Sequence, residues 1–127
     1  MNLKDYFKNA KGHGVLATAD ADGKTNAALY ARPHFFDDGT VAFIMAEKTT
    51  YKNLQTNPNA TYLFIEAGEG YKGKRLYLTR LKEEQDKELI NRLRLERSKR
   101  VFERYKDLDS RLVYFRIDKI RPLVGDQ

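Results

Sequence analysis

The sequence MAEKTTYKNLQTNPNATYLFI, residues 45–65, contains the pattern that decides the fold. An apolar segment ends here, a polar turn with two lysines and two threonines follows, and a short helical segment stops at an Asn-Pro pair before a second apolar segment. Proline disfavours helix in the residue before it. The pattern predicts a strand, a helix over residues 49–57 and another strand. Thr49 and Thr50 then lie at the helix start, where they could cap the helix or help to bind an anion such as phosphate.

Alternation of apolar and polar residues between turn signals predicts six strands in the whole chain. They cover residues 14–20, 26–36, 40–46, 60–67, 74–81 and 111–120. Pro33 lies in the second strand and should interrupt its ladder or place it at an edge, because proline has no N–H to donate. Short turns connect most of these strands, and barrel closure would remove exposed edges. We therefore expect a mainly β (α+β) fold, with a six-stranded antiparallel barrel in one domain over residues 1–127.

Two further helices are predicted, over residues 3–10 and over about 83–104. The second has an apolar stripe of Leu89, Ile90 and Leu93 and acidic residues in its first turn. Its basic residues, between positions 92 and 106, could bind nucleic acid. Interleaved leucine and aromatic residues are more typical of a solvated helical surface, and nucleic acid is the less favoured partner.

Side chains that carry common enzyme chemistry are scarce in this sequence. The absence of cysteine excludes disulfides, thiolate metal sites and cysteine nucleophiles, and no nucleotide-loop, zinc-protease or serine-hydrolase motif is present. The only serines, Ser98 and Ser110, lie in the charged C-terminal third. His13 and His34 are far apart in sequence, so no metal site is expected. Any chemistry is expected from a bound cofactor, and no catalytic residue is singled out.

Location and membrane association are also expectations at this stage. No stretch of 18 apolar residues occurs, and the first residues lack the apolar segment of a signal peptide. A cytoplasmic protein without a membrane partner is expected.

The segment EKTTYKNLQTNPNATYLFI resembles the flavin-binding split-barrel family typified by pyridoxamine 5'-phosphate oxidase. In that family a turn rich in Ser, Arg and Lys precedes a helix that ends in Asn-Pro. The segments NAALYARPHFFDDGTVAFIM and VYFRIDKIRPL also match strands of the family, so the resemblance covers roughly residues 3–124. It implies a Greek-key split barrel, a homodimer, and FMN bound in a cleft at the dimer interface.

The resemblance also implies which residues would hold the phosphate of FMN. Thr49 and Thr50 would face the phosphate, with Lys48 and Lys52 nearby, and Arg32 would reach it from the neighbouring strand. The family commonly has Arg or Lys where this chain has the two threonines. The grip on the phosphate would therefore depend more on hydroxyl groups, backbone amides and the two lysines.

The remaining implied contacts concern the flavin ring. Leu29, Tyr30 and Ala31 would run along the ring and offer backbone groups to its polar edge, and Phe43 and Ile44 would form the floor. Residues 71–77 of a partner chain would close the other side.

Three functions remain open at this stage. The first is a small FMN-dependent redox protein of unknown substrate. The second is a barrel that binds haem or a deazaflavin, with His34 or His13 as a possible axial ligand of haem. The third is a basic nucleic-acid-binding barrel without redox chemistry. The simplest interpretation of Arg32 is that it is a surface arginine at the end of a strand.

Overall fold

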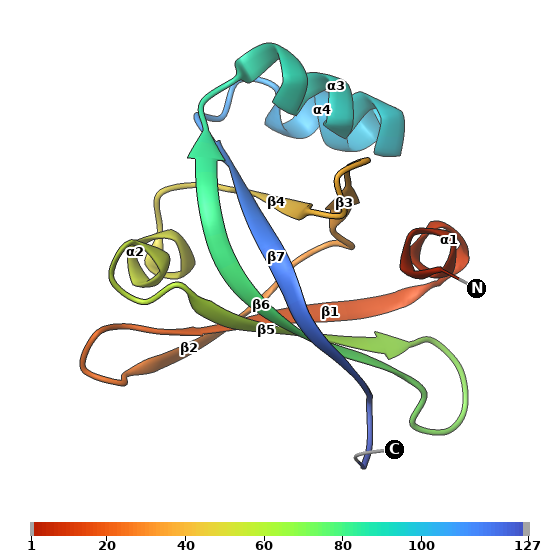
Figure 1. The fold of residues 1–127 in the computed structure, drawn as a ribbon. Helices are drawn as coiled ribbons and strands as arrows, with labels where there is room; N and C mark the ends of the chain where they lie inside the picture. Colours follow the sequence, from red (N-terminus) through yellow and green to blue (C-terminus); the bar gives the residue numbers. More distant parts are fainter. Residues whose placement is uncertain (1, 126–127) are drawn as a thin grey trace.

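Residues 2–125 are described by the computed structural model, and they form seven strands and four helices. The strands are β1 (Gly12–Ala19), β2 (Thr25–Leu29), β3 (His34–Phe35), β4 (Val41–Met45), β5 (Asn59–Glu66), β6 (Gly73–Glu84) and β7 (Arg111–Pro122). The helices are α1 (Leu3–Asn9), α2 (Thr49–Thr56), α3 (Lys87–Arg97) and α4 (Lys99–Tyr105). Helices α1 and α2 flank the sheet at opposite sides, and α3 and α4 form a hairpin at one end (Figure 1).

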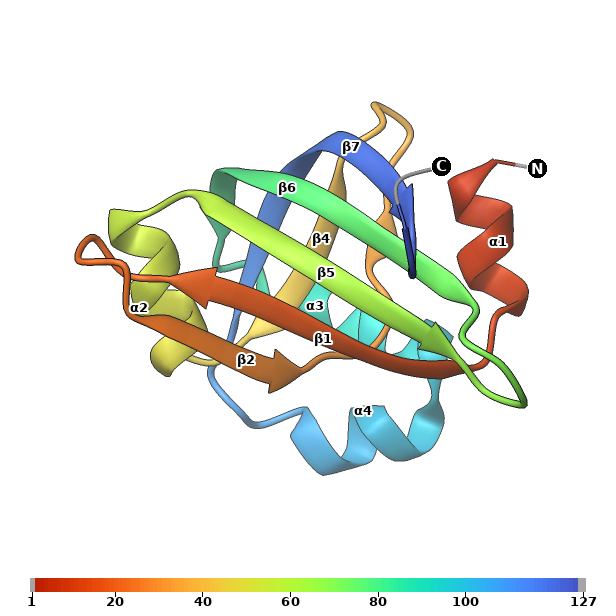
Figure 2. The ribbon, with the colours of Figure 1, turned by 90° about the horizontal axis from the view of Figure 1, so that it is seen from below.

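All seven strands belong to one antiparallel sheet in the order β2-β1-β5-β6-β7-β4-β3. The two longest strands, β6 and β7, are bent, and they connect the β2-β1-β5 part of the sheet to its β4-β3 part (Figures 1 and 2). Their pairing shifts register between Tyr77 and Leu78 and again between Arg80 and Lys82. Such irregularities increase the local bend and twist of a strand. The bend brings β2 and β4, which are distant in the strand order, to two sides of the same space.

The antiparallel α+β class is as predicted, but the number of strands is seven rather than six. The predicted strand over residues 26–36 is divided into β2 and β3, and Pro33 lies in the break, as its missing N–H group led us to expect. The predicted closure of the barrel is not seen either. Strands β2 and β3 are the two ends of the sheet order, and within residues 2–125 no ladder joins them.

The helix predicted over residues 83–104 is wrong at its start and in its continuity. Strand β6 extends through Glu84, and α3 begins only after Asp86, whose side chain accepts a hydrogen bond from the Leu89 amide. Ser98 has an extended backbone, ends α3 and starts α4 by accepting a hydrogen bond from the Val101 amide. Serine is a favoured N-cap residue, so the break is a local effect of this side chain.

The main core lies inside the curved sheet and is rich in aromatic side chains. Phe43 contacts Tyr62 with ring centroids 5.0 Å apart, and Phe7 of α1 reaches the same cluster. Gly14 has a packing reason to be glycine, because a Cβ atom there would lie 1.9 Å from the Tyr62 hydroxyl oxygen. None of the helices in the described part of the chain has the length and apolar character that a bilayer crossing requires.

Candidate functional site

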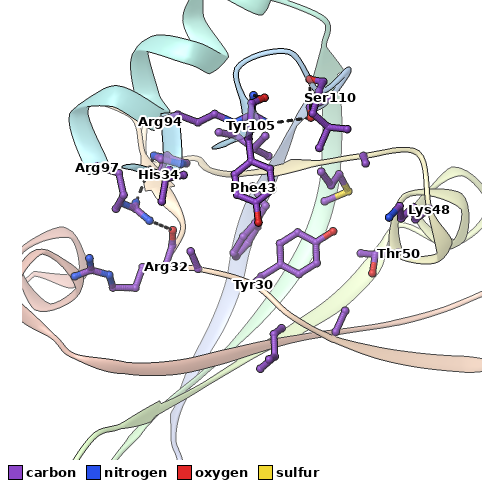
Figure 3. A pocket seen from close by; sticks show the side chains of 18 of the residues that line it. Tyr30, Arg32, His34, Phe43, Lys48, Thr50, Arg94, Arg97, Tyr105 and Ser110 are labelled. Carbon is purple, nitrogen blue, oxygen red and sulfur yellow. Dashed lines mark hydrogen bonds between the residues drawn. The ribbon is translucent and has the colours of Figure 1, made fainter. Parts of the chain in front are cut away.

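A pocket of about 670 Å³ lies between β2, β4, the start of α2 and the α3-α4 hairpin (Figure 3). Its volume is in the usual range for sites that bind small molecules. No aspartate or glutamate is among its lining residues, whereas one lysine and three arginines are. Nine of the ten predicted site residues line it: Leu29, Tyr30, Ala31, Arg32, Phe43, Ile44, Lys48, Thr49 and Thr50. The tenth, Lys52, is exposed on α2 outside this lining.

The start of α2 opens on this pocket without a side-chain cap. Lys48 is the N-cap residue and its side chain makes no capping hydrogen bond, so neither threonine caps the helix. Thr50 is buried, and its hydroxyl oxygen accepts a hydrogen bond from the side-chain Nδ2 of Asn26 at 3.3 Å. The first turn contains no acidic residue to offset the positive end of the helix dipole. Free N–H groups, the threonine hydroxyls and the Lys48 ammonium favour an anionic ligand group here.

Contacts to two strands hold α2 in place. The buried Asn53 side chain donates to the Thr18 hydroxyl at 3.1 Å, and the Tyr51 hydroxyl donates to Glu83 at 2.6 Å. Glu83 also accepts from Arg80 at 2.6 Å, and these hydrogen bonds keep the pKa of its carboxyl below the ordinary value despite its burial. The orientation of the helix start is therefore fixed from the far side of the helix.

Aromatic residues form the middle of the pocket. The rings of Tyr30 and Phe43 meet edge to face, with centroids 5.9 Å apart. Burial raises the pKa of Tyr30, an effect that the Thr50 side chain partly offsets, so the phenol stays protonated at neutral pH and can donate. Its hydroxyl points toward Thr50 (Figure 3). The backbone of Tyr30 is already engaged, because its N–H donates to the Gly14 carbonyl and its carbonyl accepts from the Tyr62 hydroxyl.

Arg32 lies at the opposite side of the pocket from Lys48 and Thr50 (Figure 3). Its guanidinium donates to the carbonyl oxygens of Phe7 at 2.8 Å and Ala10 at 3.0 Å, at the end of α1. Carbonyl groups at a helix C-terminus lack partners within the helix, so they attract this cation. The structure therefore does not bring the Arg32 side chain to the predicted phosphate position.

The α3-α4 wall of the pocket was not anticipated from the sequence. Arg94 is only 6% exposed and donates to the Ser110 hydroxyl and the Tyr105 carbonyl, both at 2.9 Å. The Arg97 guanidinium donates a hydrogen bond to the Arg32 carbonyl at 2.9 Å, and this bond connects α3 to the segment between β2 and β3. Burial lowers the pKa of both guanidinium groups, but neither titrates near neutral pH. The spacing of Ile90, Arg94 and Arg97 on one helix face is the signal that could have identified them.

The two histidines occupy different places. His34 lines the pocket, and its Nδ1 atom lies 3.4 Å from Arg97 Nη2. Burial, reinforced by the charge of Arg97, lowers the pKa of His34 to about 4, so the ring is neutral at neutral pH. His13 is exposed on β1 and borders a second, smaller hollow. Within residues 2–125 no group of three or more His, Cys, Asp or Glu side chains could hold a metal ion.

Comparisons with known proteins identify the fold. No family model matches the sequence, and no curated relative is detected. An FMN-binding protein from Syntrophomonas wolfei matches with a TM-score of 0.78 and 19% identity, over 97% of this chain and 84% of that one. The haem storage protein HutZ from Vibrio cholerae matches with a TM-score of 0.74 and 20% identity, over 93% and 89%. A candidate pyridoxamine 5'-phosphate oxidase from Lactobacillus delbrueckii matches at 0.66 and 15%, over 94% and 92%.

The TM-scores of 0.66–0.78 over nearly the whole chain establish a common fold, and the low identities of 15–20% leave the ligand open. The resemblance that the sequence shows around residues 45–65 is thus confirmed at the level of the fold. The chain has the split-barrel fold of the pyridoxamine 5'-phosphate oxidase-like proteins.

Proposed function

We propose that the pocket binds FMN, with the phosphate at the start of α2, and that the protein is a small flavin-dependent redox protein. The observation that carries this proposal is the uncapped start of α2, with buried Thr50, at the edge of a pocket lined by Tyr30 and Phe43. The N–H groups and hydroxyls suit a phosphate, and the aromatic residues suit a planar ring. FMN would supply the electron or hydride transfer chemistry when bound.

The residues of the chain would bind and orient this cofactor. Lys48 would offset part of the phosphate charge, and the protonated Tyr30 hydroxyl would offer a hydrogen bond within the pocket. Arg94 and Arg97 add positive charge on the opposite wall, and the lining contains no acidic side chain. This charge balance favours a dianionic ligand over a neutral one. The match to an FMN-binding protein of known structure is consistent with this assignment.

Removal of the Thr50 hydroxyl should weaken binding of FMN but not of riboflavin, which lacks the phosphate. The Thr50→Val variant keeps the side-chain shape and is expected to lose about 1 kcal/mol of FMN binding, the typical value of one hydrogen bond. Fluorescence titration of both flavins against both proteins measures the difference.

Thr56→Val provides the matched control, because Thr56 lies at the other end of α2 and is outside the pocket lining. It should leave both affinities unchanged. Equal affinity of the unmodified protein for FMN and riboflavin would show that the helix start does not bind the phosphate. Failure to bind either flavin would rule out the proposed function as a whole.

Haem is the second candidate, favoured by one specific observation. His34 lines the pocket with a neutral ring whose Nδ1 is near Arg97, and a neutral imidazole can be an axial ligand. The structural match to HutZ adds to this alternative. The absorbance spectrum of the purified protein decides between the two, because a haem gives an intense Soret band that flavins lack.

We also propose that a second copy of the chain completes the pocket. Leu29 is 76% exposed at the pocket edge, and Leu108 on the same lining is 48% exposed. Ligand sites normally bury most of the ligand, and a symmetric pair would cover these apolar side chains. The sequence-based expectation that residues 71–77 of the partner contribute is retained within this proposal. Light scattering is expected to show a dimer at micromolar concentration with FMN bound, and a monomer that retains FMN would contradict it.

A further inference from the structure

We propose that Arg32 and Arg97 form a second binding site, separate from the start of α2, for the carboxylate or phosphate group of a small anion. The site is a hollow of about 280 Å³ next to the main pocket. Gly14, Tyr62 and Phe64 also line it, and residues 29–31 are shared with the main pocket. The two arginines also border a third hollow, so they lie where three openings meet.

The first support for this site is uncompensated positive charge. Arg32 and Arg97 are both partly buried, and within residues 2–125 neither forms an ion pair with a carboxylate. Their hydrogen bonds go to backbone carbonyls and to His34, which are neutral acceptors. Glu96 borders the third hollow but is exposed and pairs with neither. Burial of two neighbouring cations is unfavourable, and a bound anion would relieve it.

The mutual influence of these charges agrees with the geometry. Burial lowers the pKa of Arg97, and the charge of Arg32 lowers it further. Burial raises the pKa of Tyr62, and the positive charges of Arg97 and Arg32 partly offset this rise. Arg32, Arg97 and Tyr62 therefore lie around the same hollow. An anion bound there would be close to two positive charges and one phenol.

The second support is the set of donors that remain available. The hydrogen bonds of Arg32 use only Nη1, which leaves Nε and Nη2 without a protein acceptor. The bonds of Arg97 use Nη1 and Nη2 and leave Nε. Among the described residues, Arg80 Nε is the only buried side-chain nitrogen or oxygen without a partner, so these three nitrogens reach solvent. Because backbone carbonyls already fix both guanidinium groups, little further entropy is lost when they bind a ligand.

The third support is the shape of the hollow. Gly14 keeps its β1 side open, since a Cβ atom there would lie 1.9 Å from the hydroxyl oxygen of Tyr62, which also lines the hollow. Tyr62 and Phe64 provide an aromatic wall. A cationic edge beside an aromatic wall suits a small organic anion with one carboxylate or phosphate group.

The test is a titration of the full chain with inorganic phosphate and, separately, with acetate at constant ionic strength. The Nε–H signals of arginine in ¹⁵N NMR spectra report binding directly. We expect saturable shifts of the Arg32 and Arg97 signals with at least one of the anions, and that anion identifies the group recognised. Arg32→Gln should weaken the binding at least tenfold. Arg32→Lys keeps the charge but loses the planar guanidinium with its paired N–H donors, and it should weaken the binding at least threefold.

Arg92→Gln is the matched control, because Arg92 is exposed on α3 and its loss changes the net charge equally. It should leave the affinity unchanged. Shifts that do not saturate, or equal weakening by Arg92→Gln, would overturn the proposal. If Thr50→Val weakens phosphate binding and the Arg32 variants do not, the anion site is at α2 and the present proposal fails. The Arg32 titration does not depend on flavin, so the absence of FMN binding would leave this result unaffected.

Discussion

The Phe43→Ala variant is expected to lose about 3–5 kcal/mol of unfolding free energy, the usual cost when a large buried aromatic side chain is truncated. Phe43 is 2% exposed on β4, and its ring contacts those of Tyr30, Tyr62 and Phe115 at centroid distances of 5.9, 5.0 and 5.8 Å. Alanine would leave a cavity that these rings cannot fill without leaving their own contacts. The same side chain lines the main pocket, so its loss changes core and site together.

Urea denaturation measures the loss in stability. Phe43→Leu should cost less than about 1.5 kcal/mol, since most of the buried volume is kept. Leu29→Ala truncates an exposed side chain of the same pocket and should change stability by less than about 0.5 kcal/mol. If Phe43→Ala were as stable as Phe43→Leu, the ring would not be part of a close-packed core, and the description of the pocket floor would be wrong.

Local sequence signals were sufficient for much of the fold. The turn, helix and Asn-Pro stop in residues 45–65 gave α2 within one residue of its observed end, because proline limits the helix irrespective of its surroundings. Pro33 correctly indicated a break in the ladder for the same local reason. The family resemblance implied Tyr30 and Phe43 as site residues, and both line the main pocket, while their role toward a flavin stays a prediction.

Other features depend on contacts between distant segments. The extent of β6 through Glu84 is set by its pairing with β7, and a helical pattern in the same residues could not reveal that pairing. Arg32 turns toward α1 because free carbonyl groups lie there, which the local sequence does not indicate. Arg94 belongs to a charged segment, and its burial follows from the fold of α3 and α4 over the site. Side-chain direction and tertiary pairing were therefore the parts that the sequence left open.

Acidification should destabilise the unmodified protein more than a His34→Asn variant. As the pH falls from 7 to 4, we expect an extra loss of about 2–3 kcal/mol of unfolding free energy in the unmodified protein. The pKa of His34 is lowered to about 4 in the folded state, first by burial and then by Arg97, against an ordinary value of 6.5. Between these values the unfolded chain binds a proton that the folded chain does not, so the stability present above pH 6.5 is lost as the pH falls.

The comparison between variants isolates this effect, because the carboxyl groups of the protein titrate in the same range in every variant. Asparagine cannot titrate, and its Oδ1 can still accept a hydrogen bond from Arg97, as His34 Nδ1 does in the native pocket. His13→Gln removes the exposed histidine of β1 and should follow the profile of the unmodified protein. Urea denaturation at intervals between pH 4 and 7 measures all three profiles. If the difference between the unmodified protein and His34→Asn stays constant with pH, His34 is accessible to protons in the folded state. The pKa of His34 in the folded protein would then stay near its ordinary value of 6.5, which would contradict the described burial of the ring beside Arg97.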